Sequence, residues 1–376
     1  MEFRDLGKQY SSMKHQINQA IQEVLNSTHF IQGSQVRKLE NTLADYVGVK
    51  HCVTCANGTD ALLLALMAWN IGPGDAVFVP DFTFFSSGEV VSTVGATPIF
   101  VDVNMDTYNI SIESLQKMIE ETLARTELIP KVIVAVDLFG QPAEYDAIRK
   151  VADKYHMYIL EDGAQGFGGN INHKKACSFG DISTTSFFPA KPLGCYGDGG
   201  AIFTDNDEWA ALLQSFKVHG KGESKYDNIR IGMNSRLDTI QAAVLLAKLP
   251  IFDKKELEEE DKLATFYTAK LKKFVKTPVV KEHYFSSWAQ YTIQLKNKEE
   301  RDGLQQFLKD NDIPTAVYYQ KPMHQQKAFG MHQYDDKNYE NTIKLSKTAL
   351  SLPFDPYMDA EDADKVVSKI IEYMEK

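Results

Sequence analysis

The sequence has few cysteines, no long apolar run and no excess of positive charge. Four cysteines are too few for a disulfide scaffold in a chain of 376 residues. The longest strongly apolar run, at 61–69, cannot span a bilayer, and the first residues are charged where a signal peptide would be apolar. We therefore expect a cytoplasmic protein that has no membrane partner.

Acidic side chains outnumber basic ones by 51 to 41, which gives a formal net charge of −10 at pH 7. This charge repels polyanions, so we expect no nucleic-acid partner, although a local basic pocket could still bind a small phosphate compound. Cys52 and Cys55 form a C-x-x-C pair, but HCVTCA is typical of a buried strand, in which residues three apart point to opposite faces. The cysteine and histidine spacing fits no zinc site, so we expect neither a redox pair nor a metal.

Short apolar segments alternate with amphipathic ones, which predicts an α/β fold with a mostly parallel sheet. The expected strands are HCVTCA, AVFVP, TPIFVDV, KVIVAVDL, YILED, STTSFF and GAIFT, and the expected helices include TDALLLALMAW, SIESLQKMIEETLA and AEYDAIRKVADKY. A dinucleotide-binding oxidoreductase would need a G-x-G-x-x-G turn after the first strand, and none occurs there.

The composition changes after residue 250, where the charged run DKKELEEEDK begins. We interpret this run as a solvated helix that leads from a large domain, 1–250, to a smaller C-terminal α+β domain, 251–376. The second domain is expected to contain the strands AQYTIQL and TAVYY and the helices ERDGLQQFLKD and DADKVVSKIIEYMEK.

Polar groups gather where the predicted strands end, and ligands of open α/β sheets bind beyond such ends. After the first strand, Asn57, Gly58 and Thr59 lead directly into a helix, so this turn is either an anion seat or ordinary helix capping. After the second strand, the three phenylalanines of DFTFFSS offer either a surface for a planar ring or core filling.

The strand YILED ends in two carboxylates, Glu161 and Asp162, and a buried carboxylate is costly unless a cation compensates it. The candidate cation is Lys191, which lies between two prolines on an apolar, glycine-bearing loop. Taken alone, this loop would favour a lysine that extends to solvent. Together with the aromatic, acid, amide and hydroxyl residues of the other strand ends, a desolvated Lys191 meets the needs of a pyridoxal phosphate site better than surface lysines such as Lys174 and Lys175 do.

Ordered blocks along nearly the whole chain resemble the DegT/DnrJ/StrS-type nucleotide-sugar aminotransferases: FRDLGKQY, ANGTDAL, EDGAQGFGG, SFFPAKPLGCYGDGGAIFT, GMNSRLDTIQAAVLLAKL and SLPFDPYMD. The resemblance implies the pyridoxal-phosphate-dependent transferase fold of type I, the aspartate-aminotransferase type. It also implies a homodimer with shared active sites, and transfer of an amino group from glutamate to a nucleotide-linked keto-sugar.

The resemblance further implies roles for single residues. Lys191 matches the lysine that links covalently to the cofactor, Asp162 the partner of the ring nitrogen, Gln165 a contact of the ring hydroxyl, and Phe84 the aromatic that stacks on the ring. The remaining matches are phosphate contacts at Gly58, Thr59 and Ser186, a phosphate contact from the neighbouring subunit at Asn234, and substrate contacts at Arg236 and at the segment of Tyr318 and Tyr319. Asn234 also suits a plain helix N-cap, and both interpretations can hold together.

Two positions depart from the family pattern. Gly163 replaces a usual alanine, with little consequence for the cofactor. In TAVYYQKPMH, Tyr318, Tyr319 and Gln320 stand where relatives commonly have His-Tyr-Pro. This segment faces the substrate in the family, which leaves the sugar contacts open without affecting the cofactor chemistry.

Two other classes on this scaffold are disfavoured, because the related sugar dehydratases have histidine in place of Lys191 and a regulator would need an additional binding domain. The blocks most resemble enzymes that aminate UDP-2-acetamido-2-deoxy-3-oxo-glucuronate on the way to a surface polysaccharide such as lipopolysaccharide O-antigen. A guanidinium suits the carboxylate of this sugar, so Arg236 and Arg230 are the candidate contacts, with Lys321 and His324 near the altered tyrosine pair as further candidates. The alternative substrate is a dTDP-linked 3- or 4-keto-6-deoxyhexose.

Overall fold

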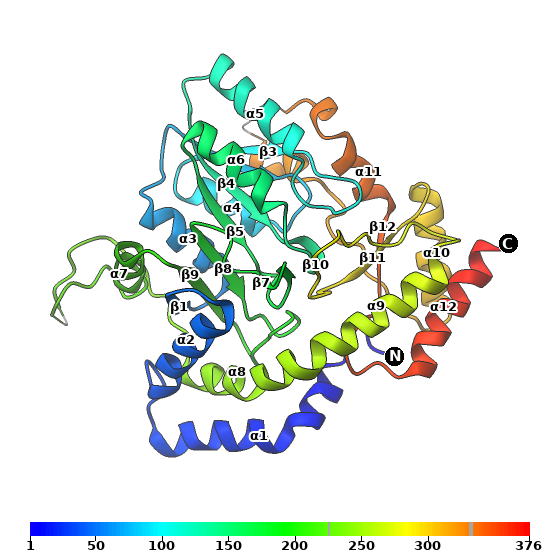
Figure 1. The fold of residues 1–376 in the computed structure, drawn as a ribbon, viewed down its shortest axis with the longest axis horizontal. Helices are drawn as coiled ribbons and strands as arrows, with labels where there is room; N and C mark the ends of the chain where they lie inside the picture. The colour runs from blue at the N-terminus through cyan, green and yellow to red at the C-terminus, as the bar shows by residue number, and fades with distance from the viewer. Residues whose placement is uncertain (225, 331–333) are drawn as a thin grey trace.

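The computed structural model describes residues 1–224, 226–330 and 334–376 (Figure 1). Its centre is a seven-stranded sheet with the order β1-β9-β8-β5-β4-β2-β3. These strands are β1 (His51–Cys55), β2 (Asp75–Pro80), β3 (Thr97–Val101), β4 (Ile129–Val136), β5 (Tyr158–Asp162), β8 (Ile182–Ser186) and β9 (Gly200–Thr204). Only the pairs that involve β9 are antiparallel in this sheet, so the expected mostly parallel sheet is confirmed.

Helices cover both faces of the sheet. They are α2 (Ser34–Val47), α3 (Gly58–Ala68), α4 (Ser86–Thr93), α5 (Ile112–Arg125), α6 (Tyr145–Tyr155), α7 (Asp207–Phe216) and α8 (Thr239–Ile251), and α1 (Leu6–Ser27) packs against α8. Alternate residues of β2 point to opposite faces: Val77 and Val79 pack in one core with α3, α4 and α7, whereas Ala76 and Phe78 pack in another with α5 and α6. Burial on both faces explains why β2 is an unbroken apolar run.

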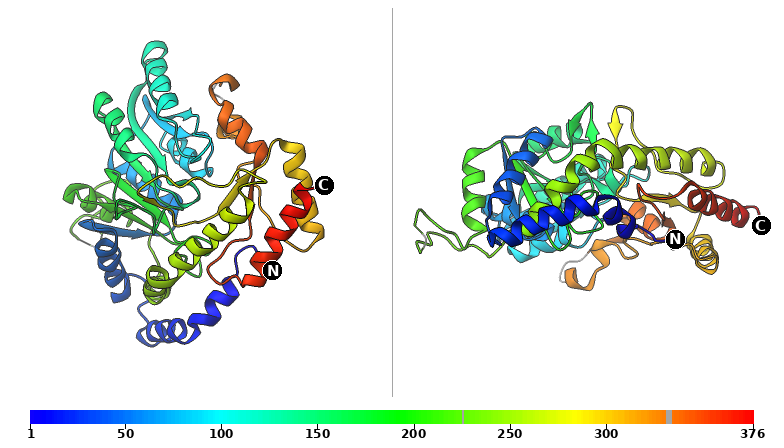
Figure 2. Two further views of the ribbon diagram at one scale, coloured as in Figure 1. Left: turned by 45° about the vertical axis from the view of Figure 1, so that its right-hand side comes forward. Right: turned by 90° about the horizontal axis from the view of Figure 1, so that it is seen from below.

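The C-terminal part has its own core, beside the sheet in Figures 1 and 2. Its elements are α9 (Leu257–Leu271), β11 (Tyr291–Gln294), α10 (Lys298–Asp310), α11 (Glu340–Thr348), β12 (Ala349–Leu352) and α12 (Ala360–Met374), and β11 and β12 form an antiparallel pair. A small sheet joins β10 (Tyr284–Phe285), β6 (Asn170–Ile171) and β7 (Lys174–Lys175). Helix α8 continues through a π turn, Phe252–Glu256, into α9, so the expected division at residue 250 falls within a continuous helical stretch and stays a prediction.

Two expectations for this part are wrong. The segment TAVYY, 315–319, is no regular strand: Ala316 forms only an isolated bridge with Ser351, and Tyr319 has a left-handed backbone with φ 55°. The charged run at 253–262 is not fully solvated, because Glu256 and Glu260 are each only 1% exposed. One face of this helical run turns inward, toward the N-terminal residues of the chain.

Those N-terminal residues supply the partners of the two buried carboxylates. Gln9 Nε2 donates to Glu256 Oε1 at 2.9 Å, and Arg4 Nη2 lies 3.2 Å from Glu260 Oε1. The partners are 247 and about 256 positions away in the chain. A charge run read in isolation therefore gives no sign of them.

The first strand supports the interpretation of HCVTCA as a buried strand. Cys52 packs in a core with α2 and α8, and Cys55 packs in the core that contains α3, so the two thiols lie on different faces. All four cysteines are buried and unpaired, and burial raises the pKa of the Cys55 thiol to about 12. Among the described residues, every helix is too short or too polar to span a lipid bilayer.

We predict that Glu260 makes stability depend on pH. Burial raises its pKa from 4.5 to about 8, against the opposing charge of Arg4. Between these values the folded protein holds a proton that the unfolded chain has lost, so the contribution of Glu260 to stability falls as the pH rises through this window, by an amount on the order of 5 kcal/mol.

The test compares melting temperatures of the wild type, Glu260→Gln and Glu258→Gln across this pH window. Glu258 is the matched control, because it is an exposed carboxylate on the same helix. Whatever the offset between the curves, the wild type should lose stability relative to Glu260→Gln as the pH rises, and it should run parallel to Glu258→Gln. Parallel curves for wild type and Glu260→Gln would contradict the buried-proton account.

Candidate active site

The parallel strands β1, β2, β4, β5 and β8 end at one edge of the sheet, and the expected cofactor residues lie on the loops that follow. β1 leads to Gly58 and Thr59, β2 to Phe84, β5 to Asp162 and Gln165, and β8 to Ser186 and Lys191. Residues from four separate stretches of the sequence are thereby gathered at one place.

The first of these stretches is the N-terminus of α3. Asn57 caps the helix through its side chain, and the helix begins at Gly58. A Cβ at position 58 would lie 2.7 Å from the Cβ of Ser186, so only glycine allows β8 to approach the helix this closely. Thr59 Oγ1 lies 2.8 Å from Ser86 Oγ, which adds hydroxyls to the amides of the first turn. The capping interpretation is therefore confirmed, and the anion seat stays a prediction that the capped turn does not exclude.

Lys191 is the amine of the site. Its backbone amide donates to the Phe188 carbonyl at 2.8 Å, and the residue is partly buried. Within the part of the chain that the structure describes, its Nζ has no hydrogen bond or ion pair. Burial lowers its pKa, and the negative charge of Asp162 opposes that shift. A lysine in this state has a larger neutral fraction than a surface lysine and is the better nucleophile.

Asp162 ends β5 and is only 6% exposed. Its Oδ2 accepts a hydrogen bond from Ser87 Oγ at 2.8 Å, and its Oδ1 accepts one from the Ala164 amide at 3.3 Å. Burial raises the pKa of Asp162, whereas the Ser87 hydrogen bond and the charge of Lys191 lower it. The carboxylate thus has the cationic neighbour that the sequence led us to expect.

Glu161 does not use that cation. Adjacent strand residues point to opposite faces, so Glu161 lies on the other side of the sheet from Asp162. It accepts hydrogen bonds from the backbone amides of Cys177, Phe179 and Gly180 and from the hydroxyl of Ser183. The expectation of one cation for both carboxylates is corrected: fixed N–H and O–H donors serve Glu161 instead.

Gln165 is buried, and both ends of its amide group have partners. Oε1 accepts from the Phe139 amide at 2.6 Å, and Nε2 donates to the hydroxyl of Tyr319 at 2.9 Å. Burial raises the pKa of Tyr319. Tyr319, in the segment that the resemblance assigns to the sugar, is therefore hydrogen-bonded to a residue that the resemblance assigns to the cofactor. The contact of Gln165 with a ring hydroxyl stays a prediction.

Only one of the three phenylalanines after β2 is exposed. Phe84 is 59% exposed, whereas Phe82 is fully buried against Phe139 and Tyr319. Phe85 packs against the ring of Phe329. Core filling therefore explains Phe82 and Phe85, and Phe84 remains as the surface for a planar ring.

Arg230, Asn234 and Arg236 lie between α7 and α8, on a segment whose loop extends away from the sheet in Figure 1. Arg230 Nη1 donates to Ser215 Oγ at 2.6 Å. Arg236 is partly buried and makes no hydrogen bond or ion pair with any described residue. The capping interpretation of Asn234 is wrong, because α8 begins only at Thr239.

This loop is anchored beside the candidate site. Ser235, between Asn234 and Arg236, accepts a hydrogen bond on its Oγ from the Ala56 amide at 3.0 Å, just before the first turn of α3. Its own amide donates to the Lys217 carbonyl at 2.9 Å. The base of the loop is therefore next to the anion seat.

The two C-terminal residues proposed as substrate contacts, His324 and Tyr318, differ in how many partners they already have within the protein. His324 is buried, with Nδ1 2.6 Å from Asp81 Oδ2 and Nε2 3.0 Å from Asp336 Oδ1. Burial lowers its pKa, but the hydrogen bonds and charges of the two carboxylates outweigh this and raise it. Tyr318 is partly buried, and its ring lies 6.4 Å from that of Phe3. Both ring nitrogens of His324 are occupied here, so its contact with a substrate stays a prediction.

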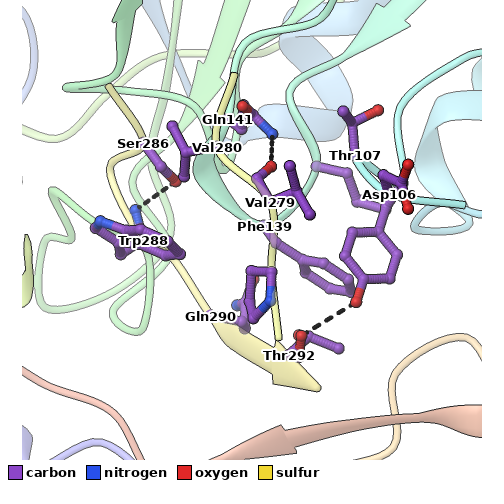
Figure 3. Close-up of a pocket in the computed structure, with 13 residues that line it drawn as sticks. Asp106, Thr107, Phe139, Gln141, Val279, Val280, Ser286, Trp288, Gln290 and Thr292 are labelled. Atoms are coloured by element: carbon purple, nitrogen blue, oxygen red, sulfur yellow. Dashed lines mark hydrogen bonds between the residues drawn. The ribbon is translucent and has the colours of Figure 1, made fainter. Parts of the chain in front are cut away.

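A separate pocket lies between the loop after β4 and β11, with Phe139, Trp288 and Gln290 among its walls (Figure 3). Its volume of about 20 Å³ is room for roughly one water molecule, so it is too small for a sugar.

Sequence reasoning missed the hydroxyl groups of Thr83, Ser86 and Ser87. The available signal was the stretch FTFFSS, which places hydroxyl residues on both sides of the exposed aromatic.

Comparisons with known proteins identify the family of the chain. The sequence model of the DegT/DnrJ/EryC1/StrS aminotransferase family matches residues 11–371. A UDP-2-acetamido-2-deoxy-3-oxo-D-glucuronate aminotransferase from Pseudomonas aeruginosa is 42% identical over 362 residues, 96% of each chain. A dTDP-3-amino-3,6-dideoxy-alpha-D-galactopyranose transaminase from Aneurinibacillus thermoaerophilus is 35% identical over 99% of each chain.

Among solved structures, a DegT DnrJ EryC1 StrS aminotransferase from Brucella abortus is similar over 100% of both chains, with a TM-score of 0.97 and 46% identity. The fold of the chain is accordingly that of the type I pyridoxal-phosphate-dependent transferases, and its cofactor is pyridoxal phosphate. The chain belongs to the DegT/DnrJ/EryC1/StrS aminotransferase family.

Proposed function

We propose that this aminotransferase moves an amino group from L-glutamate to the keto group of a nucleotide-linked sugar, with Lys191 as its catalytic amine. The observation that carries the assignment concerns the Nζ of Lys191. It has no hydrogen bond or ion pair with any described residue, and it is close enough to the buried Asp162 for the charge of that carboxylate to act on it. Both groups lie at the sheet edge where α3 offers an anion seat.

The described residues fit pyridoxal phosphate. Gly58, Thr59 and Ser186 would hold its phosphate, because the glycine opens a space that a side chain would fill and the other two add hydroxyls. Phe84 would cover the face of its ring, and Asp162 would hold a proton on its ring nitrogen. When bound, the cofactor supplies an electron sink for the electrons released at the α-carbon of the amino donor.

Lys191 would then move the proton. Its neutral Nζ would take the proton from the α-carbon of glutamate and pass it to the cofactor in the first half-reaction, and in the second it would carry a proton from the cofactor to the sugar carbon. Burial supports this role, because the lowered pKa of Lys191 increases its neutral fraction. Burial raises the pKa of Asp162, and the hydrogen bond from Ser87 and the charge of the nearby amine oppose that shift and favour the ionised form.

For the substrate we propose UDP-2-acetamido-2-deoxy-3-oxo-glucuronate. The 42% identical relative acts on this sugar, and the carboxylate of the sugar needs a cation that has no partner within the protein. Arg236 meets that condition among the described residues. A dTDP-linked 3- or 4-keto-6-deoxyhexose is the second candidate, which the 35% identical relative favours. The amino-sugar product would enter surface polysaccharide, made from nucleotide-sugars in the cytoplasm.

We also propose a homodimer in which Asn234 and Arg236 serve the site of the partner subunit. Large apolar side chains are exposed near these residues and elsewhere, including Ile231 at 89% and Phe30 at 45%. Exposed apolar groups of this size favour burial against another protein surface.

Replacing Lys191 with alanine should abolish turnover while the protein still binds the cofactor noncovalently. Borohydride reduction of the loaded wild type, followed by peptide mapping, should place the label on Lys191. Lys174→Ala is the control, because Lys174 is an exposed lysine outside the site. A label on any other lysine would overturn the assignment.

Mixing two inactive variants should restore activity if the sites are shared. One variant carries Lys191→Ala, and the other carries Asn234→Ala with Arg236→Ala. After subunit exchange, a heterodimer has one intact site, so about a quarter of the wild-type activity should return at equal mixing. Exchange that is verified by mass measurement without any recovery would count against a shared site.

Arg236 should distinguish the two sugars. Arg236→Ala should lower kcat/KM for the uronic acid sugar by roughly 10- to 100-fold, the effect of losing one charge-assisted contact, and should affect a neutral dTDP-6-deoxy sugar much less. Arg236→Lys should retain part of the kcat/KM for the uronic acid sugar, because lysine keeps the positive charge but lacks the paired N–H donors of arginine. Equal turnover of the neutral sugar by the wild type would favour the second candidate.

A further inference from the structure

Asp162 accepts a hydrogen bond from one buried hydroxyl group, which in turn contacts a second buried hydroxyl group. Ser87 is fully buried and donates to Asp162 Oδ2 at 2.8 Å, and Ser87 Oγ lies 3.2 Å from Thr83 Oγ1. A hydroxyl has one proton to donate, and an ionised carboxylate only accepts. Ser87 therefore uses its proton on Asp162, and Thr83 must donate to Ser87. The chain of hydrogen bonds runs in one direction, from Thr83 through Ser87 to Asp162.

These contacts fix both oxygens of the carboxylate. Oδ2 is fixed by the short bond from Ser87, and Oδ1 receives the longer bond from the Ala164 amide at 3.3 Å. Thr83 is 3% exposed, so water does not compete for either hydroxyl. Both hydrogen bonds go to the same carboxylate, so the Ser87 contact is the stronger of the two constraints because it is shorter, 2.8 Å against 3.3 Å.

The same segment carries the exposed aromatic of the site. Thr83 and Ser87 are four residues apart and flank Phe84, and Ser87 lies in the first turn of α4. Its amide also donates to the Phe84 carbonyl at 3.2 Å. One short stretch therefore fixes the position of Phe84 relative to the carboxylate of Asp162.

We propose that Ser87 is a positioning residue, oriented by Thr83, that keeps Asp162 ionised and directed at the ring nitrogen of the cofactor. The proposal rests on the role of Asp162 proposed above. Without Ser87, Oδ2 would be a buried oxygen without a donor, and the protonated form of the carboxyl group would gain relative to the ionised form. A protonated Asp162 holds the ring nitrogen in its charged state less well.

The test measures the protonation of the ring nitrogen directly, by ¹⁵N NMR of protein loaded with ring-¹⁵N-labelled pyridoxal phosphate. Ser87→Ala should move the signal toward that of the neutral nitrogen and weaken cofactor binding by about tenfold or more. Thr83→Val keeps the shape of the side chain and removes only its hydroxyl, so it should shift the signal in the same direction by less. Turnover should show a lower kcat with little change in the KM of the nucleotide-sugar.

Ser346→Ala is the matched control. Ser346 is also a buried helical serine, but its hydroxyl donates only to the Ile343 carbonyl of its own helix, α11. This variant should leave the ¹⁵N signal, cofactor affinity and kcat unchanged. Melting curves of all variants separate lost folding from lost positioning, and the shape-preserving Thr83→Val carries the test if Ser87→Ala does not fold.

Asp162→Asn distinguishes a failure of the positioning role of Ser87 from a failure of the proposed role of Asp162. If Asp162→Asn moves the ring nitrogen signal and neither Ser87→Ala nor Thr83→Val does, the positioning role of Ser87 is overturned while the proposed role of Asp162 stands. If Asp162→Asn leaves the signal at its wild-type position, the proposed role of Asp162 itself is wrong. A shift in Ser87→Ala, a smaller one in Thr83→Val and none in Ser346→Ala support the proposal.

Discussion

The buried carboxylate of Asp162 is the constraint on which the site depends. An ionised carboxyl group at the end of an apolar strand loses its hydration, and only nearby charge and hydrogen-bond donors can offset that loss. Here the offset comes from Lys191 on the loop after β8 and from Ser87 on α4. Three elements that are distant in sequence must therefore meet at one edge of the sheet.

The other buried carboxylates of the chain show that this arrangement is specific. Glu161 is neighbour to Asp162 in sequence and is equally buried, yet backbone amides and a hydroxyl satisfy it without a cation. Glu260 has Arg4 within 3.2 Å and a raised pKa, far along the helix that leads into the C-terminal part. Among the described residues, Asp162 is the one buried acid that adjoins an amine without a hydrogen-bond partner. The proposed amino transfer needs an amine in this state.

The sequence was sufficient for the sheet and for the meeting of Asp162 and Lys191 at its edge. Apolar runs such as those of β2 and β4 and the polar residues at strand ends are local patterns, and the strand ends meet because parallel strands share an edge. Contacts between distant segments had no local signal. The inward face of the charged run at 253–262 depends on Arg4 and Gln9 at the other end of the chain, and the left-handed turn at Tyr319 depends on tertiary packing. The role of Ser87 was equally hidden, because a serine in a helix's first turn is usually a matter of capping.

In the proposed site, one sheet edge holds the cofactor between Lys191, Asp162 and the N-terminus of α3. A crystal structure of the protein grown with pyridoxal phosphate tests it most directly. We expect electron density continuous from Lys191 Nζ to the cofactor, the ring nitrogen within hydrogen-bond distance of Asp162, and the phosphate against Gly58, Thr59 and Ser186. Cofactor density joined to a different lysine, or a phosphate bound away from the first turn of α3, would contradict the account.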